Sequence, residues 1–219
     1  MAEGFLEALS GDEAEAFRAV GIQRSFRANV TLIHQGDESG PVIVLLRGRV
    51  KIAAAAEGGR EAIVALRGSG DLVGELAAID GGPRSTSVTT LEPVEALLVP
   101  RSEFTALLER RPRIALVILR TVAAHLRYAG AQQAQFATHD VTGRLAQRLL
   151  ELAERFGMQR ESGIEIELPL TQEELASWVG ASREAVSKAL QLLRSLRIVQ
   201  TGRRRVTVLD HEALARRAR

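Results

Sequence analysis

Residues 171–196 read TQEELASWVGASREAVSKALQLLRSL, and their spacing predicts two short helices joined by a tight turn. Thr171 and Glu174 form a capping-box pattern, so we expect the first helix to begin directly after Thr171. Gly180 supplies the backbone freedom that a tight turn requires, and Ser182 can cap the second helix. The stretch is therefore typical of a helix-turn-helix.

Each predicted helix has one apolar face. In the first helix we expect Leu175 and Val179 to be buried and the small Ala176 to allow a close helix crossing. In the second, the apolar face comprises Val186, Ala189, Leu190 and Leu193, and the opposite face of its first turns carries Arg183, Glu184, Ser187 and Lys188. Polar and charged side chains on the N-terminal turns favour a helix that enters the major groove of DNA. The alternative is an ordinary helical hairpin with a solvated polar face.

The next segment, IVQTGRRRVTVL at 198–209, predicts two strands around a turn at Thr201-Gly202, with basic residues at or just past its tip. Such a wing can reach a phosphate backbone. Seven basic residues and one acidic residue lie between positions 181 and 209, a net charge of +6 in a chain whose formal charge is +2. This concentration favours a nucleic-acid interface over a merely solubilising tip. The candidate DNA-binding residues are Thr171, Ser182, Arg183, Glu184, Ser187, Lys188, Arg203 and Arg204, with Arg205 also near the tip.

Composition excludes several classes of function. The 219 residues are 46% apolar and 26% charged, and they include no cysteine, which rules out disulfides and thiolate metal sites. The N-terminus lacks the pattern of a signal peptide, and the apolar run 114–126 is interrupted by Arg120, so we expect a cytoplasmic protein without a membrane segment. The four histidines are scattered, and no catalytic motif appears, so we predict neither a metal site nor an enzyme.

The texture of the chain predicts an α+β protein. The chain starts with a short predicted helix, which a capping box at Ser10 and Glu13 begins. From about residue 21 to residue 100, short strands of β-branched and apolar residues follow. Glycines mark the turns between these strands, and Gly58-Gly59 is one such turn. Such strands favour a closed or sandwiched antiparallel unit. Residues 101–138 are helical again, with one long helix after Pro112, and a further helix follows His139-Asp140. We expect a sensing domain at 1–112, a long helix at 113–139 and a DNA-binding domain at 140–219.

The long helix carries an apolar stripe at three- and four-residue steps, formed by Leu119, Val122, Leu126, Ala129, Gln133 and Phe136. This spacing is typical of a heptad seam, and groove-reading helices usually act as two-fold pairs, so we predict a homodimer. The alternative is that the stripe packs against the β unit of its own chain. Gly130 and the nearby glutamines weaken the stripe as a coiled coil.

A glycine-rich loop at 70–87 is the candidate small-molecule site. Gly74 permits a close backbone approach, and residues 75–77 can open a short helix whose amides favour an anion. Arg84 offers a fork for a phosphate, Ser85 adds a hydroxyl, and Glu75 is an acceptor suited to a ribose hydroxyl. Taken alone, the pattern is equally consistent with a turn that carries a surface ion pair.

The order Gly74-Glu75-Leu76-Ala77 followed by Pro83-Arg84-Ser85-Thr86 resembles the phosphate-binding cassette of cyclic-nucleotide-binding domains. With Asp140-Val-Thr-Gly-Arg144 and the helix SREAVSKAL, the whole chain resembles the cyclic-AMP receptor protein/fumarate-nitrate regulator family. The resemblance implies an antiparallel β-roll sensor of the cyclic-nucleotide-binding type, a long dimerisation helix and a C-terminal winged helix-turn-helix. It implies that Gly74, Glu75, Leu76, Arg84 and Ser85 hold a cyclic nucleotide. The resemblance also places Arg183, Glu184 and Lys188 at the family's three base-reading positions. Arg183 and Lys188 are suited to guanine acceptors and Glu184 to a cytosine amino group, so we predict palindromic, GTG-rich half-sites in double-stranded DNA. The other expected partners are a second copy of the chain and RNA polymerase.

One departure concerns the effector. Cyclic-AMP-responsive members have hydrogen-bonding side chains on the long helix where this chain has Ala129 and Gly130. The resemblance therefore leaves open a different effector, or constitutive DNA binding without one. A third alternative is a nucleotide-binding interaction module whose helix-turn-helix contacts protein.

Overall fold

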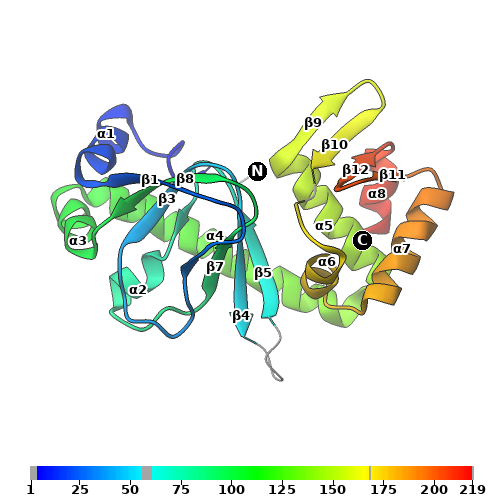
Figure 1. Cartoon of the computed structure of the whole chain (residues 1–219), viewed down its shortest axis with the longest axis horizontal. Coiled ribbons are helices and arrows are strands. Elements are labelled where there is room, and N and C mark those ends of the chain that lie inside the picture. The colour runs from blue at the N-terminus through cyan, green and yellow to red at the C-terminus, as the bar shows by residue number, and fades with distance from the viewer. Residues whose placement is uncertain (1–3, 56–60, 168, 219) are drawn as a thin grey trace. The chain divides into compact units, whose positions relative to one another are not determined.

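The structure, a computed structural model, describes residues 4–55, 61–167 and 169–218. The chain divides into two compact units, and the boundary between Arg127 and Tyr128 falls within one long helix, α4 (Pro112–Thr138). Figure 1 shows the helices and strands of each unit. Each unit has its own sheet system and its own buried core. The predicted helix after Pro112 and its end at His139-Asp140 are confirmed.

The N-terminal unit is an antiparallel β-roll. Its strands are β1 (Ile22–Phe26), β2 (Thr31–Ile33), β3 (Val42–Arg47), β4 (Val50–Ala55), β5 (Glu61–Arg67), β6 (Leu72–Val73), β7 (Ser87–Thr90) and β8 (Val94–Val99). They form two four-stranded sheets in the orders β1-β8-β3-β6 and β2-β7-β4-β5. The predicted antiparallel unit is confirmed. The glycine turn expected at 58–59 lies outside the described residues.

Helices cover the first of these sheets. They are α1 (Gly11–Val20), α2 (Glu75–Asp80), α3 (Arg101–Arg110) and the first half of α4. The predicted capping box at Ser10 and Glu13 starts α1. Phe17 packs edge-on against Phe104 of α3 with ring centroids 6.3 Å apart. Ile114 at the start of α4 is fully buried in the same cluster. Burial of these aromatic and aliphatic side chains is the main favourable term in the stability of the unit.

The C-terminal unit is a winged helix-turn-helix with an additional hairpin. Its elements are α5 (Val141–Phe156), β9 (Gly157–Arg160), β10 (Gly163–Glu167), α6 (Gln172–Val179), α7 (Arg183–Ser195), β11 (Val199–Gly202), β12 (Arg205–Val208) and α8 (His211–Arg217). The strands form one antiparallel sheet in the order β11-β12-β10-β9 (Figure 1). Asp140 caps α5 by accepting from the amide of Gly143. Leu145, Leu149 and Leu152 of α5 are fully buried and form the centre of the unit.

The turn of the wing differs from the sequence prediction. Thr201 and Gly202 are the last residues of β11, and Gly202 pairs with Arg205, so the turn is Arg203-Arg204. Arg204 adopts the left-handed conformation, with φ of 55°. A two-residue hairpin turn commonly needs positive φ, and a glycine beside it is the usual sequence signal for that geometry. Here the cross-strand pairing, rather than the position of the glycine, determines the turn. Strand β6, hairpin β9–β10 and helix α8 had no counterpart in the prediction.

Helix α4 is the one helix in the described residues that is long and apolar enough to cross a membrane by length and composition. Its residues Ile114, Val117 and Ile118 are buried in the core of the N-terminal unit. The start of α4 therefore belongs to the core of the N-terminal unit.

Candidate nucleic-acid interface and effector site

The helix-turn-helix forms through the local interactions that its sequence predicts. The Thr171 hydroxyl accepts from the amide of Glu174 at 3.1 Å, and the Glu174 carboxylate accepts from the amide of Thr171 at 2.8 Å. Gly180 ends α6 in the left-handed conformation, with φ of 68°. The Ser182 hydroxyl accepts from the amide of Ala185 at 3.2 Å and caps α7. Both predicted helix starts are confirmed.

Packing fixes which face of α7 points outward. The expected faces of α6 are buried at Leu175, Ala176 and Val179, as is Trp178, which the sequence analysis had not singled out. On α7, Val186, Ala189 and Leu193 are buried, and Leu190 is half-buried. The opposite side chains Arg183, Glu184, Ser187 and Lys188 are all exposed. The structure therefore brings these four candidate DNA-binding residues together on one solvated face.

Glu184 is held in its charged form. Backbone hydrogen bonding at its own amide, and then a hydrogen bond from Ser182, lower the pKa of this carboxyl below its usual value. The charges of Arg183 and Lys188 act in the same direction. Since an ionised carboxylate is solely an acceptor, Glu184 is suited to an amino group such as that of cytosine.

The wing separates its three arginines. Arg203 and Arg204 form the turn itself and are exposed. Arg205 lies on β12, where its guanidinium is 3.6 Å from the carboxylate of Glu165 on β10. Arg203 and Arg204 thus present their charge at the tip, whereas the charge of Arg205 is partly balanced within the sheet.

In the N-terminal unit, the loop before α2 has the geometry expected of an anion cradle. Gly74 has φ of 82° and precedes the first residue of the helix, Glu75, which confirms the expected short helix. A Cβ at Gly74 would lie 2.6 Å from Nη1 of Arg84, so a larger residue there would force the guanidinium to shift from its present position. Glycine is therefore required both by the backbone and by the close approach of Arg84.

Arg84 is buried, with 5% of its surface exposed. It donates from Nη1 to the carbonyl of Gly74 and from Nη2 to the carbonyl of Pro41, each at 2.7 Å. Its own backbone is fixed by hydrogen bonds with Gly36 and Asp37. A guanidinium has five N–H groups, so these two bonds leave further donors that can bind a phosphate. Ser85 is exposed beside it.

The charges around Arg84 are weakly solvated. Glu75 is 7% exposed, and its burial raises the pKa of the carboxyl, although Arg67 and Arg84 act to lower it. Burial likewise lowers the pKa of Arg84. Arg67 is itself 7% exposed and follows Ile63 and Ala65 on the same face of β5. Alternation with Ile63 and Ala65 is the sequence signal for this inward position, but an arginine is so rarely buried that its residue type alone favours solvent.

The remaining candidate residues, on α2 and α4, differ in how exposed they are. Leu76, on α2, is 43% exposed. On α4, Leu119 and Leu126 are 63% and 74% exposed, whereas Val122 packs against the core of the N-terminal unit. Ala129 and Gly130 are exposed.

Phe136, at the end of the stripe, is 49% exposed. Its ring lies against Gly180 and 5.3 Å from the guanidinium carbon of Arg144. It therefore has contacts inside its own C-terminal unit.

Comparison with known proteins agrees with this architecture. A family model for the cyclic nucleotide-binding domain matches residues 23–111, and one for the Crp-like helix-turn-helix domain matches residues 143–217. The chain is 38% identical over 189 residues to a CRP-like cAMP-activated global transcriptional regulator of Mycobacterium tuberculosis, covering 86% of this chain and 84% of that protein. It is 28% identical over 197 residues to the global nitrogen regulator of a Nostoc species, covering 89% and 88%.

Among solved structures, the c-di-GMP responsive global regulator CLP of Xanthomonas campestris aligns with a TM-score of 0.79 and 24% identity, covering 91% of this chain and 99% of that one. This likeness supports the fold. The two matched domains occur in the same order as the β-roll and the winged helix-turn-helix described above. The chain belongs to the Crp/Fnr family of DNA-binding transcription regulators.

Proposed function

We propose that this regulator acts as a homodimer whose affinity for palindromic DNA is set by an anionic, nucleotide-like effector bound in the β-roll. The observation that carries the effector part is Arg84, a buried arginine held close to Gly74, where any side chain would strain the backbone and displace the guanidinium. Burying a guanidinium is unfavourable unless its N–H groups are hydrogen-bonded, and a bound phosphate would add both acceptors and a compensating negative charge.

The exposed face of α7 is proposed to read the DNA. Arg183 and Lys188 are suited to the guanine acceptors and Glu184 to the cytosine amino group, so the half-site should be GTG-rich. Thr171, Ser182 and Ser187 carry hydroxyl groups suited to phosphate or base contacts near the same helix starts. Arg203 and Arg204 at the wing tip should contact phosphates without regard to sequence.

Dimerisation is proposed to occur through α4. Leu119 and Leu126 are seven residues apart, and more than half of each side chain is exposed. Val122 lies between them on the stripe, and Ala129 and Phe136 follow Val122 at successive seven-residue steps. Large exposed leucines at heptad spacing favour a two-stranded seam, because burial against a second copy removes their apolar surface from water.

The effector is proposed to be recognised mainly through its ribose and phosphate. Arg84 and Ser85 would hold the phosphate, with the backbone of Gly74 and Leu76, and Glu75 would accept from the ribose. Ala129 and Gly130 offer no side-chain donor or acceptor to a base, so discrimination between bases should be weak. The names of relatives mention both cAMP and c-di-GMP, which supports leaving the class of nucleotide open.

Constitutive DNA binding is the second candidate. The observation that favours it is that the carbonyls of Gly74 and Pro41 already accept hydrogen bonds from Arg84, which gives this residue a structural role without any ligand. In either case we propose a cytoplasmic regulator that contacts RNA polymerase and has no enzymatic activity.

Two measurements test the proposal. Selection from random DNA should return a two-fold-related GTG-rich motif, and binding should weaken steeply with salt. A protein-interaction module would give neither result. A thermal-shift screen of cyclic mononucleotides and dinucleotides should then find a ligand that raises the melting temperature. Arg84→Ala should abolish the shift, whereas Arg24→Ala, an exposed arginine on β1, should preserve it. Absence of any shift, with operator binding intact, would establish the constitutive alternative.

A further inference from the structure

Helix α5 carries an arginine on its core-facing side. Arg148 is 4% exposed and lies between Leu145 and Leu152, both fully buried. A buried guanidinium is tolerated when its donors and its charge have partners. The partners of Arg148 therefore show which parts of the fold it holds together.

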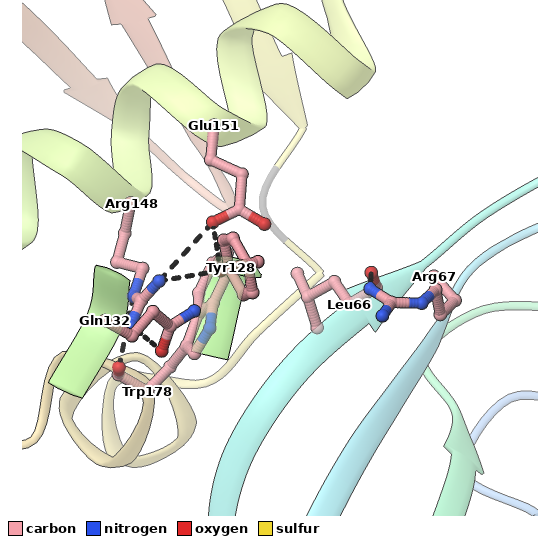
Figure 2. Close-up of polar contacts among 7 residues, drawn as sticks. All are labelled: Leu66, Arg67, Tyr128, Gln132, Arg148, Glu151 and Trp178. Atoms are coloured by element: carbon pink, nitrogen blue, oxygen red, sulfur yellow. Dashed lines mark hydrogen bonds and ion pairs between the residues drawn. The ribbon is translucent and has the colours of Figure 1, made fainter. Parts of the chain in front are cut away.

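These partners come from three helices (Figure 2). Arg148 donates to the Tyr128 hydroxyl at 2.7 Å and to the Gln132 side-chain oxygen at 2.5 Å, and both of these residues lie on α4. It donates from Nε to the carbonyl of Trp178 on α6 at 3.3 Å. On α5 itself, the carboxylate of Glu151 lies 3.4 Å from Nη1.

Two further contacts close the cluster. The Tyr128 hydroxyl donates to Glu151 at 2.5 Å, and the guanidinium carbon of Arg148 lies 5.1 Å from the ring centroid of Trp178. The cluster of Tyr128, Gln132, Arg148, Glu151 and Trp178 is called the Arg148 cluster below. Because a planar guanidinium bonds in fixed directions, it fixes orientation as well as distance.

Residues 128–138, the end of α4, have few apolar contacts that could replace this cluster. The buried residues of α4 are Ile114, Val117 and Ile118, all near its start. In the stretch from Tyr128 to Thr138, most side chains are exposed, and the ring of Phe136 against Gly180 is the main apolar contact with α6. The attachment of this stretch to α5 and α6 is therefore largely polar.

The Arg148 cluster is also incompletely satisfied. Within the described residues, Gln132 Nε2 and Trp178 Nε1 are buried and have no hydrogen-bond partner. An unmade hydrogen bond in a buried network offsets part of what the other bonds contribute. The remaining bonds therefore carry the attachment, so the loss of one of them should loosen it.

We propose that Arg148 is a positioning residue that fixes residues 128–138 of α4 to α5 and α6, and thereby fixes the recognition helix α7 at one orientation relative to this end of the proposed dimer seam, which carries Ala129 and Phe136. This inference rests on the proposed dimer. Helix α6 packs against α7 through the turn at Gly180, so a rigid connection from α4 to α6 reaches the DNA-reading face. In a two-fold pair, rigid connections of this kind set the distance between the two recognition helices.

The test uses the full chain and a palindrome obtained by selection, together with versions in which one base pair is inserted at or removed from the centre. One base pair turns a half-site by ~35° and moves it by ~3.4 Å, so a rigid dimer should bind the altered sites poorly. Tyr128→Phe removes only the hydroxyl and keeps the ring. In this variant we expect the ratio of affinities between the selected and altered sites to fall by roughly three- to thirtyfold, the range for one member of a coupled network.

Two further variants separate positioning from folding. Arg148→Lys keeps the charge but loses the planar fork, so it should show the same tolerance of spacing as Tyr128→Phe. Arg155→Gln removes an exposed arginine from the same helix and should retain the wild-type ratio. A role in stability alone would lower the melting temperature and leave the ratio unchanged. Wild-type spacing preference in both Tyr128→Phe and Arg148→Lys would overturn the proposal.

Hydrogen exchange provides a readout that requires neither DNA nor a dimer. Amides of residues 128–138 should exchange about tenfold faster in Tyr128→Phe, with those of α7 unchanged, because a locally released helix end opens more often. Unchanged exchange in 128–138 would also refute the inference. If the wild type itself yields no two-fold site, the proposed dimer fails, and the exchange experiment alone decides the role of Arg148.

Discussion

Gly180 and Phe136 offer a quantitative test of how the end of α4 meets the helix-turn-helix. Gly180 has φ of 68°, and a Cβ at this position would overlap the ring of Phe136. Substitution by alanine should cost ~1–2 kcal/mol for the left-handed backbone. Displacing the ring should add ~1–3 kcal/mol, the usual range for overpacking. The total loss in unfolding free energy is therefore about 2–5 kcal/mol.

The second contribution depends on Phe136, so a double-mutant cycle isolates it. In a Phe136→Ala background, Gly180→Ala should cost only the backbone contribution of ~1–2 kcal/mol. Urea unfolding followed by fluorescence reports this unit cleanly, because the chain has a single tryptophan, Trp178, and it is buried in α6. Gly130→Ala is the control: nothing lies within 4 Å of the added Cβ, and the substitution should stabilise the helix by up to ~1 kcal/mol. Equal costs of Gly180→Ala in the two backgrounds, within ~0.5 kcal/mol, would refute the contact between Phe136 and Gly180.

Three further predictions concern DNA, assembly and pH. Arg183→Ala should weaken operator binding by ~1–3 kcal/mol and relax specificity at one base pair. Arg203→Ala should instead weaken binding to all DNA sequences alike and reduce the dependence of affinity on salt. Titrations against single-base operator variants at several salt concentrations distinguish the two effects. Leu126→Glu should place a charge against its symmetry mate and give a monomer by light scattering; a wild type that is monomeric even with operator DNA would contradict this expectation. Burial raises the folded-state pKa of Glu75 above its ordinary value of 4.5, so its contribution to stability is complete below that pH and is lost as the pH rises through the folded pKa. As the pH rises past 4.5, the wild type should lose unfolding free energy, whereas Glu75→Gln, which cannot ionise, should not. Denaturation curves at several pH values measure the difference in unfolding free energy between the two proteins. A difference that does not change with pH would refute this account.

The sequence by itself determined the features whose signals are local. The capping boxes at Thr171 and Ser10 each join residues three positions apart, and both form as predicted. The turn at Gly180 and the glycine before Glu75 follow from backbone conformations that favour glycine. The alternation and spacing of apolar residues identified the antiparallel unit and the faces of α6 and α7, because periodicity depends only on the geometry of each element.

Tertiary structure decided what depends on residues distant in sequence. The carbonyl that Arg84 bonds on Pro41 is 43 positions away, and the Trp178 carbonyl that Arg148 bonds is 30 positions away. In both bonds the acceptor is a backbone carbonyl, which every residue has, so no sequence motif can identify it. The wing turn likewise moved to Arg203-Arg204 because cross-strand pairing overrode the local preference of glycine. For the buried Arg84 and Arg148, the sequence shows that an arginine is present, but only the assembled fold fixes which oxygens accept hydrogen bonds from it.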